Sequence, residues 1–335
     1  MATHSEWNQE TGGLEVAKAF AGQLKGKTVL ITGVSPESIG SSTALAIASQ
    51  DPALLILASR TASKLDAVKK SIKEGYPSVH VENVILDFAS QDAIKKAASE
   101  IAKLTNRIDI IINNAAVMSE KLIHTAEGIE MQFGAGHVGH FLLTNLLLPQ
   151  LLEAAKSSTP GATRVVNVSS VGHRLSGIRF HDYNFEGKDI PADEQPPPIP
   201  PMFAKSTDGN YNGWIAYGQA KTANILFSLQ LNKLLKAKGI VSYAAHPGSI
   251  ATGLSRDLSE DSEAALAKVV TFWKNHDQGS ATTLVAAFDP ALNDPKGIML
   301  SDCQLCDAAP HATNPEAAEK LWALSEKLVK TNFKL

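Results

Sequence analysis

Charged blocks and long apolar runs are both absent from this chain, and each absence excludes a class of function. The 31 basic and 34 acidic residues give a formal net charge of -3, with no block of like charge. Nucleic-acid binding normally requires a broad basic field, so we expect no nucleic-acid partner. The longest apolar runs, such as residues 53–58, are far shorter than the roughly 18 residues that span a bilayer, so we expect no membrane span. Residues 1–26 lack the apolar core of a signal peptide, which makes the cytoplasm the expected location.

Cysteine is also scarce, because only Cys303 and Cys306 occur in 335 residues. Their C-x-x-C spacing can serve thiol exchange or supply half of a zinc site. Zinc takes four ligands, however, and the chain has no second cysteine pair. We therefore expect no metal site and favour two reduced thiols near the end of the chain.

Apolar, β-branched segments alternate along the chain with longer stretches of helical periodicity, the pattern of a parallel sheet covered by helices. The expected strands are residues 28–32, 53–59, 79–86, 108–112, 164–168, 241–245 and 298–300. The expected helices include residues 41–49, 63–75, 92–104, 141–156 and 220–238. The predicted fold class is thus α/β, a doubly wound parallel sheet of seven strands with helices on both faces.

A proline-containing insertion interrupts this alternation after the fifth strand, at about residues 173–213. Residues 196–201 read PPPIPP, which cannot continue a helix or an inner strand because proline lacks an amide donor. The segment is either a ligand for proline-recognising modules or a loop over the substrate. Its position before the chemical motifs favours the substrate loop.

A glycine-containing turn, TGVSPESIG at residues 32–40, follows the first expected strand and precedes a helix. Such a turn presents free amides and a positive helix end to a pyrophosphate, although a plain strand-to-helix turn has the same outline. The later string GAGHVG at residues 134–139 fits G-x-G-x-x-G better on paper. No strand leads into it, so we interpret it as close packing within a helix.

Two cations follow the second strand, where an acidic residue would hold a free ribose hydroxyl. Arg60 and Lys64 stand there instead, and guanidinium matches phosphate geometry. We therefore expect NADP(H), with NAD(H) less favoured. Glu37 in the glycine turn argues against a 2′-phosphate, and Arg60 is alternatively only a solvated charge at a strand end.

The polar ends of the later strands complete the pattern. Tyr217 and Lys221 lie four residues apart and share a helix face. NNAA at residues 113–116, NVSS at 167–170 and HPG at 246–248 each end a strand, at the edge where doubly wound sheets bind ligands.

With these motifs, and with GHFLLTN at residues 139–145, the chain resembles the short-chain dehydrogenase/reductase family, in its branch of retinol-dehydrogenase-like and WW-domain-oxidoreductase-like members. The resemblance covers about residues 26–330. It implies one NAD(P)-binding Rossmann-type domain at 26–330 after an N-terminal extension at 1–25. It also implies an NADP(H)-dependent enzyme, a carbonyl reductase or alcohol dehydrogenase that transfers hydride between nicotinamide and a carbonyl or alcohol of an apolar small molecule.

The resemblance also implies roles for particular residues. Tyr217 would be the general acid, Lys221 would lower the pKa of Tyr217 and hold the nicotinamide ribose, and Ser170 would orient the substrate oxygen, with Ser169 the weaker candidate. The implied cofactor-binding residues are Gly33, Ser35, Ser38, Ile39, Gly40, Arg60, Lys64, Asp87, Asn114, Ala115, Tyr217, Lys221, Pro247, Gly248, Ile250 and Thr252.

The chain departs from the family pattern at three positions. Ser38 stands in a lengthened turn where the family has its middle glycine, and Ala116 replaces a glycine. Gly136 replaces the family's helix asparagine, which helps to place a water that feeds protons toward the lysine. A slowed or rerouted relay is therefore expected, and the alternative function is a catalytically impaired, dinucleotide-binding regulatory protein.

Two further expectations concern the surroundings of the site. Aromatic and apolar residues of the insertion either line the substrate pocket or simply anchor the loop by burial; these are Phe203, Tyr211, Trp214 and Ile215. Residues 141–152 are apolar nearly all round, which fits burial by the core and by a partner. In the family this helix and that of Tyr217 form the dimer face, so a homodimer is possible.

Overall fold

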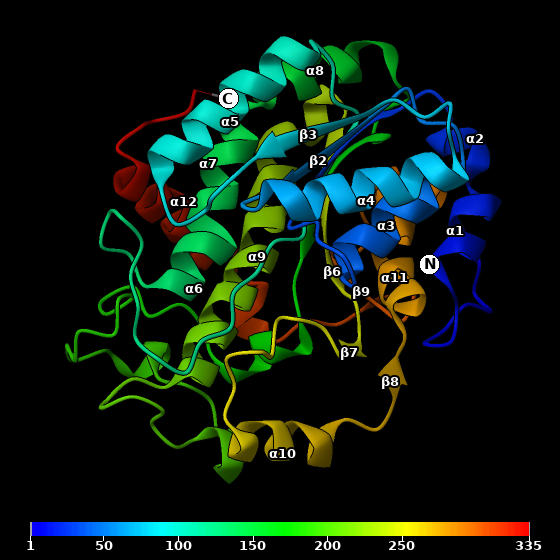
Figure 1. Cartoon of the computed structure of the whole chain (residues 1–335). Helices are drawn as coiled ribbons and strands as arrows, with labels where there is room; N and C mark the ends of the chain where they lie inside the picture. Colours follow the sequence, from blue (N-terminus) through cyan, green and yellow to red (C-terminus); the bar gives the residue numbers. More distant parts are fainter. Residues whose placement is uncertain (1, 335) are drawn as a thin grey trace.

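The computed structural model describes residues 2–334 as a parallel sheet between two layers of helices (Figure 1). The main sheet has eight strands in the order β10-β9-β6-β5-β4-β1-β2-β3. They are β1 (Thr28–Thr32), β2 (Leu54–Ser59), β3 (Val81–Ile85), β4 (Ile110–Asn113), β5 (Thr163–Val168), β6 (Ile240–His246), β9 (Met299–Ser301) and β10 (Gln304–Cys306). β7 (Ser249–Ile250) and β8 (Trp273–Lys274) form a separate two-stranded sheet.

The predicted α/β, doubly wound class is confirmed, and the structure adds one strand to the seven that were predicted. Seven strands of the main sheet are parallel, and β10 adds an eighth that runs antiparallel to β9. Asp302 and Cys303 form the two-residue turn of this hairpin, both with positive φ (49° and 66°). β10 has only three residues, too few to show an apolar alternation, and neither turn residue is a glycine.

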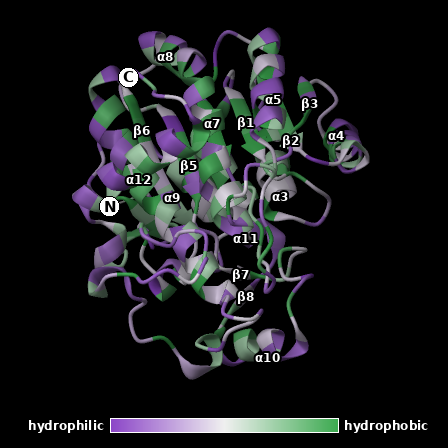
Figure 2. Ribbon diagram, turned by 90° about the vertical axis from the view of Figure 1, so that its left-hand side faces the viewer, coloured by the Kyte–Doolittle hydropathy of each residue, from purple (hydrophilic) through white to green (hydrophobic). Residues whose placement is uncertain are grey.

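Helices cover both faces of the sheet because the inner strands are buried on both sides. One core contains apolar residues of α1 (Gly13–Ala19), α3 (Ile39–Ala48), α4 (Ala62–Gly75) and α11 (His276–Phe288). The other contains residues of α5 (Gln91–Leu104), α7 (Gly139–Leu146), α8 (Leu148–Ser157), α9 (Gly213–Leu235) and α12 (Pro315–Val329). Figure 2 shows hydrophobic strands between helices whose outer turns are hydrophilic.

The helix expected at residues 141–156 is two helices, α7 and α8, which are separated at Leu147. Pro149 lies in the first turn of α8, where its missing amide costs no helical hydrogen bond. Ahead of α7, α6 (Met131–Phe133) runs into a π-helical turn at Gly134–Val138. Cβ atoms built on Gly134 and Gly139 would lie 2.5 Å from Thr125 and Phe88, so the expected close packing of the GAGHVG segment is confirmed.

The two ends of the chain pack on this frame. Trp7 and Phe20 belong to the core that includes α3 and α11, and α2 (Ala21–Leu24) leads into β1. α12 covers the outer side of α7 and α9, where Trp322 packs edge-on against Phe141 with ring centroids 4.8 Å apart. α12 thus occupies part of the face through which a homodimer was expected.

Within residues 2–334, no helix has the length and apolarity needed to cross a membrane. The cytoplasmic location and the division of the chain at residue 26 stay predictions.

Candidate functional site

The predicted site residues gather at one edge of the sheet. β3, β2, β1, β4, β5 and β6 are neighbours and run parallel, so their carboxyl ends share that edge. Asp87, Arg60, Gly33, Asn114, Ser170 and Pro247 follow these six strands in the same order. The reversal of strand order between β1 and β4 lies in the middle of the row, where open α/β sheets bind dinucleotides.

The two glycines of the turn after β1 stand where the backbone is packed too closely for a side chain. Gly33 has a φ of 73°, and a Cβ there would lie 2.6 Å from the Cα of Ala115. A Cβ on Gly40 would lie 2.8 Å from the carbonyl oxygen of Gly33. Both glycines therefore bring backbone onto backbone beside the N-terminus of α3, which fits a pyrophosphate-binding turn.

Ser38, which stands where the family has a glycine, is folded into the turn. Its hydroxyl donates to the carbonyl of Ser35 at 2.7 Å and accepts from the amide of Ser41 at 3.2 Å, which caps α3. Because the side chain points back into the turn, the serine stabilises the start of α3. The extra residue of the turn is accommodated at Glu37, whose φ of 52° is left-handed.

Arg60 and Lys64 are exposed after β2, and neither is paired with a carboxylate in residues 2–334. Asp87 accepts the amide of Ala89 through one carboxylate oxygen at 3.0 Å, and its other oxygen has no hydrogen-bond partner among residues 2–334. Asn114 donates to the carbonyl of Thr32 at 2.8 Å, so its side chain ties the end of β4 to the end of β1.

The last group of predicted cofactor contacts lies between β6 and α10 (Glu260–Val269). Gly248 has a φ of 99°, and a Cβ there would meet the side chain of Lys274 at 2.6 Å. Ile250 packs against Gly279 of α11, and the hydroxyl of Thr252 accepts the amide of Leu254 at 3.3 Å. The segment is thus held by β8 and α11 at the edge that carries the glycine turn.

Ser170, Tyr217 and Lys221 come together beside the end of β5. The Ser170 hydroxyl lies on the same side of Gly172 as the Tyr217 ring, and the Lys221 ammonium lies 5.5 Å from the centroid of that ring. Lys221 is 4% exposed and donates to the carbonyl of Val168 at 2.8 Å. The hydroxyl of Ser169 instead donates to the backbone of Lys221 at 2.8 Å, so Ser169 fastens α9 to β5.

Two glycines allow this close approach. A Cβ on Gly172 would lie 2.9 Å from the Tyr217 ring and 3.4 Å from the Ser170 hydroxyl. A Cβ on Gly218 would lie 2.9 Å from Leu175 and 3.0 Å from the carbonyl of Gly172. The loop after Ser170 therefore packs closely against α9 at Gly172 and at Gly218.

Burial dominates the ionisation of this group. Desolvation raises the pKa of Tyr217 to about 12, although the neighbouring Ser170 hydroxyl opposes the rise. Burial also lowers the pKa of Lys221 to about 8. The expectation that Lys221 lowers the pKa of Tyr217 was wrong for this structure, because burial raises that pKa while the ammonium donates to the Val168 carbonyl and lies 5.5 Å from the ring centroid.

Asn224 is a residue near the site that the sequence analysis missed. Its amide donates to the carbonyl of Gly136 at 2.8 Å, and its own oxygen is buried without a partner in the described residues. His140 shares the Gly136 carbonyl at 3.2 Å. A side-chain amide is therefore present beside Gly136 after all, but it comes from α9, one turn beyond Lys221, where no sequence motif marked it.

An apolar cluster borders Tyr217 on the insertion side. Phe203 and Trp214, with ring centroids 4.7 Å apart, pack with Met118 and Ala265. Tyr217 contacts this cluster together with further partly buried residues, namely Leu175, Ile199, Leu254, Leu258 and Leu266. Pro201–Phe203 also packs on α10, which lies below β7 at the bottom of Figure 1.

Tyr211 belongs to a different cluster. It is 1% exposed, and its hydroxyl donates to Glu130 and accepts from Gln132, both at 2.8 Å. Burial raises the pKa of Glu130, whose carboxylate also accepts the amides of Gln132 and Phe133. Tyr211 thus anchors the insertion to α6.

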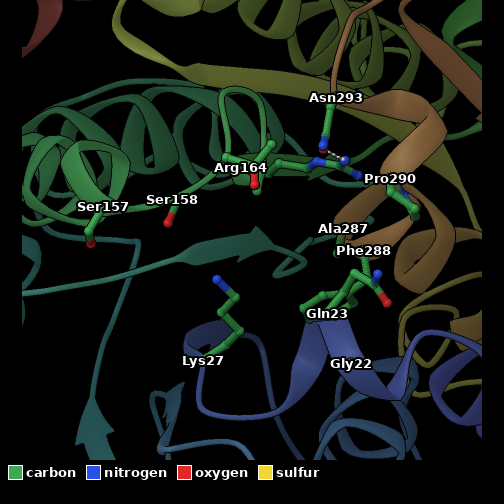
Figure 3. A pocket seen from close by; sticks show the side chains of 12 residues that line it. Gly22, Gln23, Lys27, Ser157, Ser158, Arg164, Ala287, Phe288, Pro290 and Asn293 are labelled. Atoms are coloured by element: carbon green, nitrogen blue, oxygen red, sulfur yellow. Dashed lines mark hydrogen bonds between the residues drawn. The ribbon is translucent and has the colours of Figure 1, made fainter.

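A separate cavity of about 330 Å³ opens at the opposite edge of the sheet, around the starts of β1 and β5 (Figure 3). Arg164 crosses it and donates to Asn293 at 2.6 Å and to the carbonyls of Gly161, Ala286 and Asp289. Lys27 points in from the other side and pairs with Asp109 at 3.4 Å. These contacts fasten the amino-terminal ends of the strands, far from the glycine turn.

Within residues 2–334, no three metal-ligating side chains gather into a metal site.

Comparison with known proteins agrees with this geometry. The family model for short chain dehydrogenases matches residues 27–184. Human retinol dehydrogenase 13 is 35% identical over 326 residues, covering 95% of this chain and 88% of that protein. The protein belongs to the short-chain dehydrogenase/reductase family, in its retinol-dehydrogenase-like branch.

Other relatives extend the comparison. The short-chain dehydrogenase/reductase prx1 of Penicillium rubens is 32% identical over 321 residues, covering 91% of this chain and 86% of that protein. A crystal structure of an uncharacterised protein from Mycobacterium paratuberculosis superposes with a TM-score of 0.66 at 30% identity, covering 93% and 96% of the two chains. Pseudomonas aeruginosa RhlG, solved as an NADP complex, shares the fold at 21% identity, with a TM-score of 0.59 and coverage of 83% and 94%. The chain is thus an oxidoreductase that uses a nicotinamide dinucleotide.

The close contact between Gly33 and Ala115 generates a test of the nucleotide site. Gly33→Ala should weaken dinucleotide binding at least about tenfold, because its Cβ must displace backbone at the phosphate turn. Gly128→Ala is the matched control, since Gly128 has a φ of 78° but no atom within 4 Å of a built Cβ. Fluorescence titration with NADPH should show unchanged affinity for the control. Equal affinities in both variants would contradict the assignment of the turn.

Proposed function

We propose that the protein is an NADP(H)-dependent carbonyl reductase or alcohol dehydrogenase for apolar small molecules, with Ser170, Tyr217 and Lys221 as its catalytic residues. The observation that supports this most directly is the convergence of these three side chains beside the glycine turn and the strand ends. Bound nicotinamide supplies or accepts the hydride.

Tyr217 serves as the general acid for carbonyl reduction. Its raised pKa keeps the phenol protonated at neutral pH, so a proton is available for the substrate oxygen. The Ser170 hydroxyl, within reach of the same phenol, donates to that oxygen and stabilises the negative charge that develops on it. In alcohol oxidation the same groups act in reverse.

Lys221 replenishes the proton that Tyr217 gives up. Its pKa of about 8, lowered by burial, lies close to working pH, so the ammonium can lose and regain a proton. The Val168 carbonyl holds the ammonium over the Tyr217 ring. Asn224 lies one turn further along α9 and donates to the carbonyl of Gly136 in the π-helical turn, and we assign the proton path to that side of Lys221.

The proposed class of substrate follows from the cluster beside Tyr217. Phe203, Trp214 and Met118 present apolar surface next to the phenol, and burial of apolar substrate groups there is favourable. This supports an apolar carbonyl compound or alcohol, with the insertion at 173–213 as the substrate loop. The names of several relatives refer to retinol dehydrogenases, which agrees with an apolar substrate.

The preference for NADP(H) rests on Arg60 and Lys64, two exposed cations that follow β2 without a carboxylate partner in the described residues. A guanidinium there can donate two parallel hydrogen bonds to a 2′-phosphate.

The homodimer stays a prediction, and a dimer through α7 and α9 must accommodate α12 on that face.

The second candidate function is a dinucleotide-binding regulator without turnover, which Gly136 and the altered turn favour. Such a regulator would bind the dinucleotide at the same site but would reduce no carbonyl compound. The position of Asn224 favours the enzyme, because an amide is retained beside Gly136.

Tyr217→Phe tests the catalytic assignment. Removal of the phenol oxygen should lower kcat at least about a hundredfold in a screen of apolar ketones and aldehydes that follows NADPH absorbance. The affinity for NADPH should stay within about threefold, because the ring and Lys221 remain. Turnover by the variant at the rate of the original protein would contradict the mechanism. NADPH binding without turnover by the original protein would favour the regulator.

Arg60→Ala tests the cofactor preference. Loss of the guanidinium should weaken NADPH binding about tenfold or more, since hydrogen bonds to charged groups contribute about 1.5–3 kcal/mol, and should leave NADH binding nearly unchanged. Lys70→Ala removes the same charge from an exposed position of α4 and is the control. An equal loss of affinity for both nucleotides in Arg60→Ala would contradict the proposed 2′-phosphate contact.

A further inference from the structure

The loop that carries Ser170 is tied to a distant part of the chain through one buried imidazole. His173 lies in the 3-10 turn at Val171–Leu175, directly after Ser170, and is 1% exposed. Its Nδ1 lies 2.7 Å from the carbonyl oxygen of Ser170, and its Nε2 lies 3.0 Å from the amide of Ala309. Ala309 follows β10, so the imidazole joins the serine loop to the C-terminal hairpin segment.

The chemistry of these partners determines the protonation of the ring. A backbone amide only donates, so Nε2 must accept from Ala309 and carries no proton. The proton is therefore on Nδ1 and is donated to the Ser170 carbonyl, which only accepts. Burial lowers the pKa of His173 to about 4, in agreement with a neutral ring at neutral pH.

The backbone around the imidazole is held as well. The His173 carbonyl accepts from the hydroxyl of Thr222 at 3.0 Å and from Nε2 of His311 at 2.9 Å. Thr222 follows Lys221 directly on α9, and His311 belongs to the 3-10 turn at Pro310–Ala312. His173 is thus fixed by α9 on one side and by the C-terminal segment on the other, and neither its ring nor its backbone can shift alone.

Ser170 in turn has few other restraints. Its hydroxyl accepts the amide of Gly172 at 3.0 Å, and the amide of Val171 donates to Nδ1 of His246 at 3.3 Å. Among residues 2–334, the carbonyl of Ser170 accepts only from His173, through the backbone amide at 3.1 Å and through the imidazole. The imidazole is the shorter of the two contacts and the one that reaches outside the loop.

We propose that His173 is a positioning residue. Its Nδ1–H donates to the Ser170 carbonyl and thereby keeps the Ser170 hydroxyl next to Tyr217. Its Nε2 accepts from Ala309 and thereby anchors the ring on the segment after β10. This inference rests on the proposed function of Ser170 and goes beyond it, because it adds a residue that positions the catalytic serine and that is itself anchored on the segment after β10.

A pair of isosteric variants separates the two sides of the ring. In His173→Asn the amide nitrogen stands near the position of Nδ1 and can still donate to Ser170, but Ala309 loses its acceptor. In His173→Gln the terminal oxygen stands near the position of Nε2 and can still accept from Ala309, but Ser170 loses the side-chain donor. Both variants should bind NADPH as the original protein does, because neither touches the nucleotide turn.

The two variants should then differ in opposite ways. His173→Asn should keep kcat for carbonyl reduction within about threefold and lower the melting temperature. His173→Gln should keep the melting temperature closer to that of the original protein and lower kcat about 10- to 100-fold, since small misplacements of reacting groups cost rates of this size. If His173 only anchored the C-terminal segment, His173→Gln would be fully active and His173→Asn would be the impaired variant, which would overturn the proposal.

Arg174→Ala is the matched control. Arg174 is exposed and donates to the carbonyl of Asp307 at 2.9 Å, so it links the same two segments without touching Ser170. Its loss should leave kcat unchanged. A fall in kcat as large as that of His173→Gln would show that general attachment of the segment, and not the imidazole contact, supports Ser170.

A measurement on the unmodified protein keeps the proposal testable if the variants fail to fold or if no carbonyl substrate is found. Side-chain nitrogen NMR should show His173 as a neutral ring with its proton on Nδ1 at neutral pH. A proton on Nε2, or a charged ring, would overturn the proposal. Absence of turnover in the original protein with the expected NMR signature would instead count against the proposed function and leave the His173 geometry in place.

Discussion

The close packing of the Ser170 loop against α9 is the contact on which the rest of the site depends. It exists because Gly172 and Gly218 have no side chains at the point where the loop crosses the helix. A side chain at either position would push the loop away from Tyr217, and the serine and phenol would then separate. The parallel sheet brings the strand ends to one edge, and this contact brings Ser170 beside the Tyr217 side chain of α9.

The same packing sets the electrostatics of the site. Tyr217 and Lys221 are enclosed between β5, α9 and the loop, so desolvation outweighs their mutual influence. The neutral phenol and a lysine that readily loses its proton are both consequences of that enclosure. Bound nucleotide would add further charge and hydrogen bonds near Lys221. The resting state that receives the nucleotide is therefore a protonated Tyr217 next to Lys221, which is the more deeply buried of the two.

Much of this architecture could be predicted from local sequence patterns. β1, β2, β4, β5 and β6 are rich in apolar residues, and polar motifs begin where these strands end, so both the strands and the site edge were recognisable. Gly33 could be predicted because a strand leads into it and a helix follows. The later string at 134–139 was correctly assigned to helix packing for the lack of such a strand.

The remaining features depend on contacts between residues distant in sequence. β10 is recognisable only through its pairing with β9, and the burial of Phe141 by Trp322 depends on where α12 folds back. The contact of Asn224 with Gly136 joins two helices, and Tyr211 turned out to bind Glu130 rather than border Tyr217. The direction of the Tyr217 pKa shift was misjudged for the same reason, because burial cannot be read from a spacing of four residues.

The dependence of carbonyl reduction on pH tests the central claim most directly. If a protonated Tyr217 is replenished by a Lys221 with a lowered pKa of about 8, the rate of reduction should be nearly constant below that pH. It should fall above it, as the ammonium loses its proton and can no longer supply one. A rate of reduction that rises with pH through this range would show that an ionised group is required, and would contradict the account.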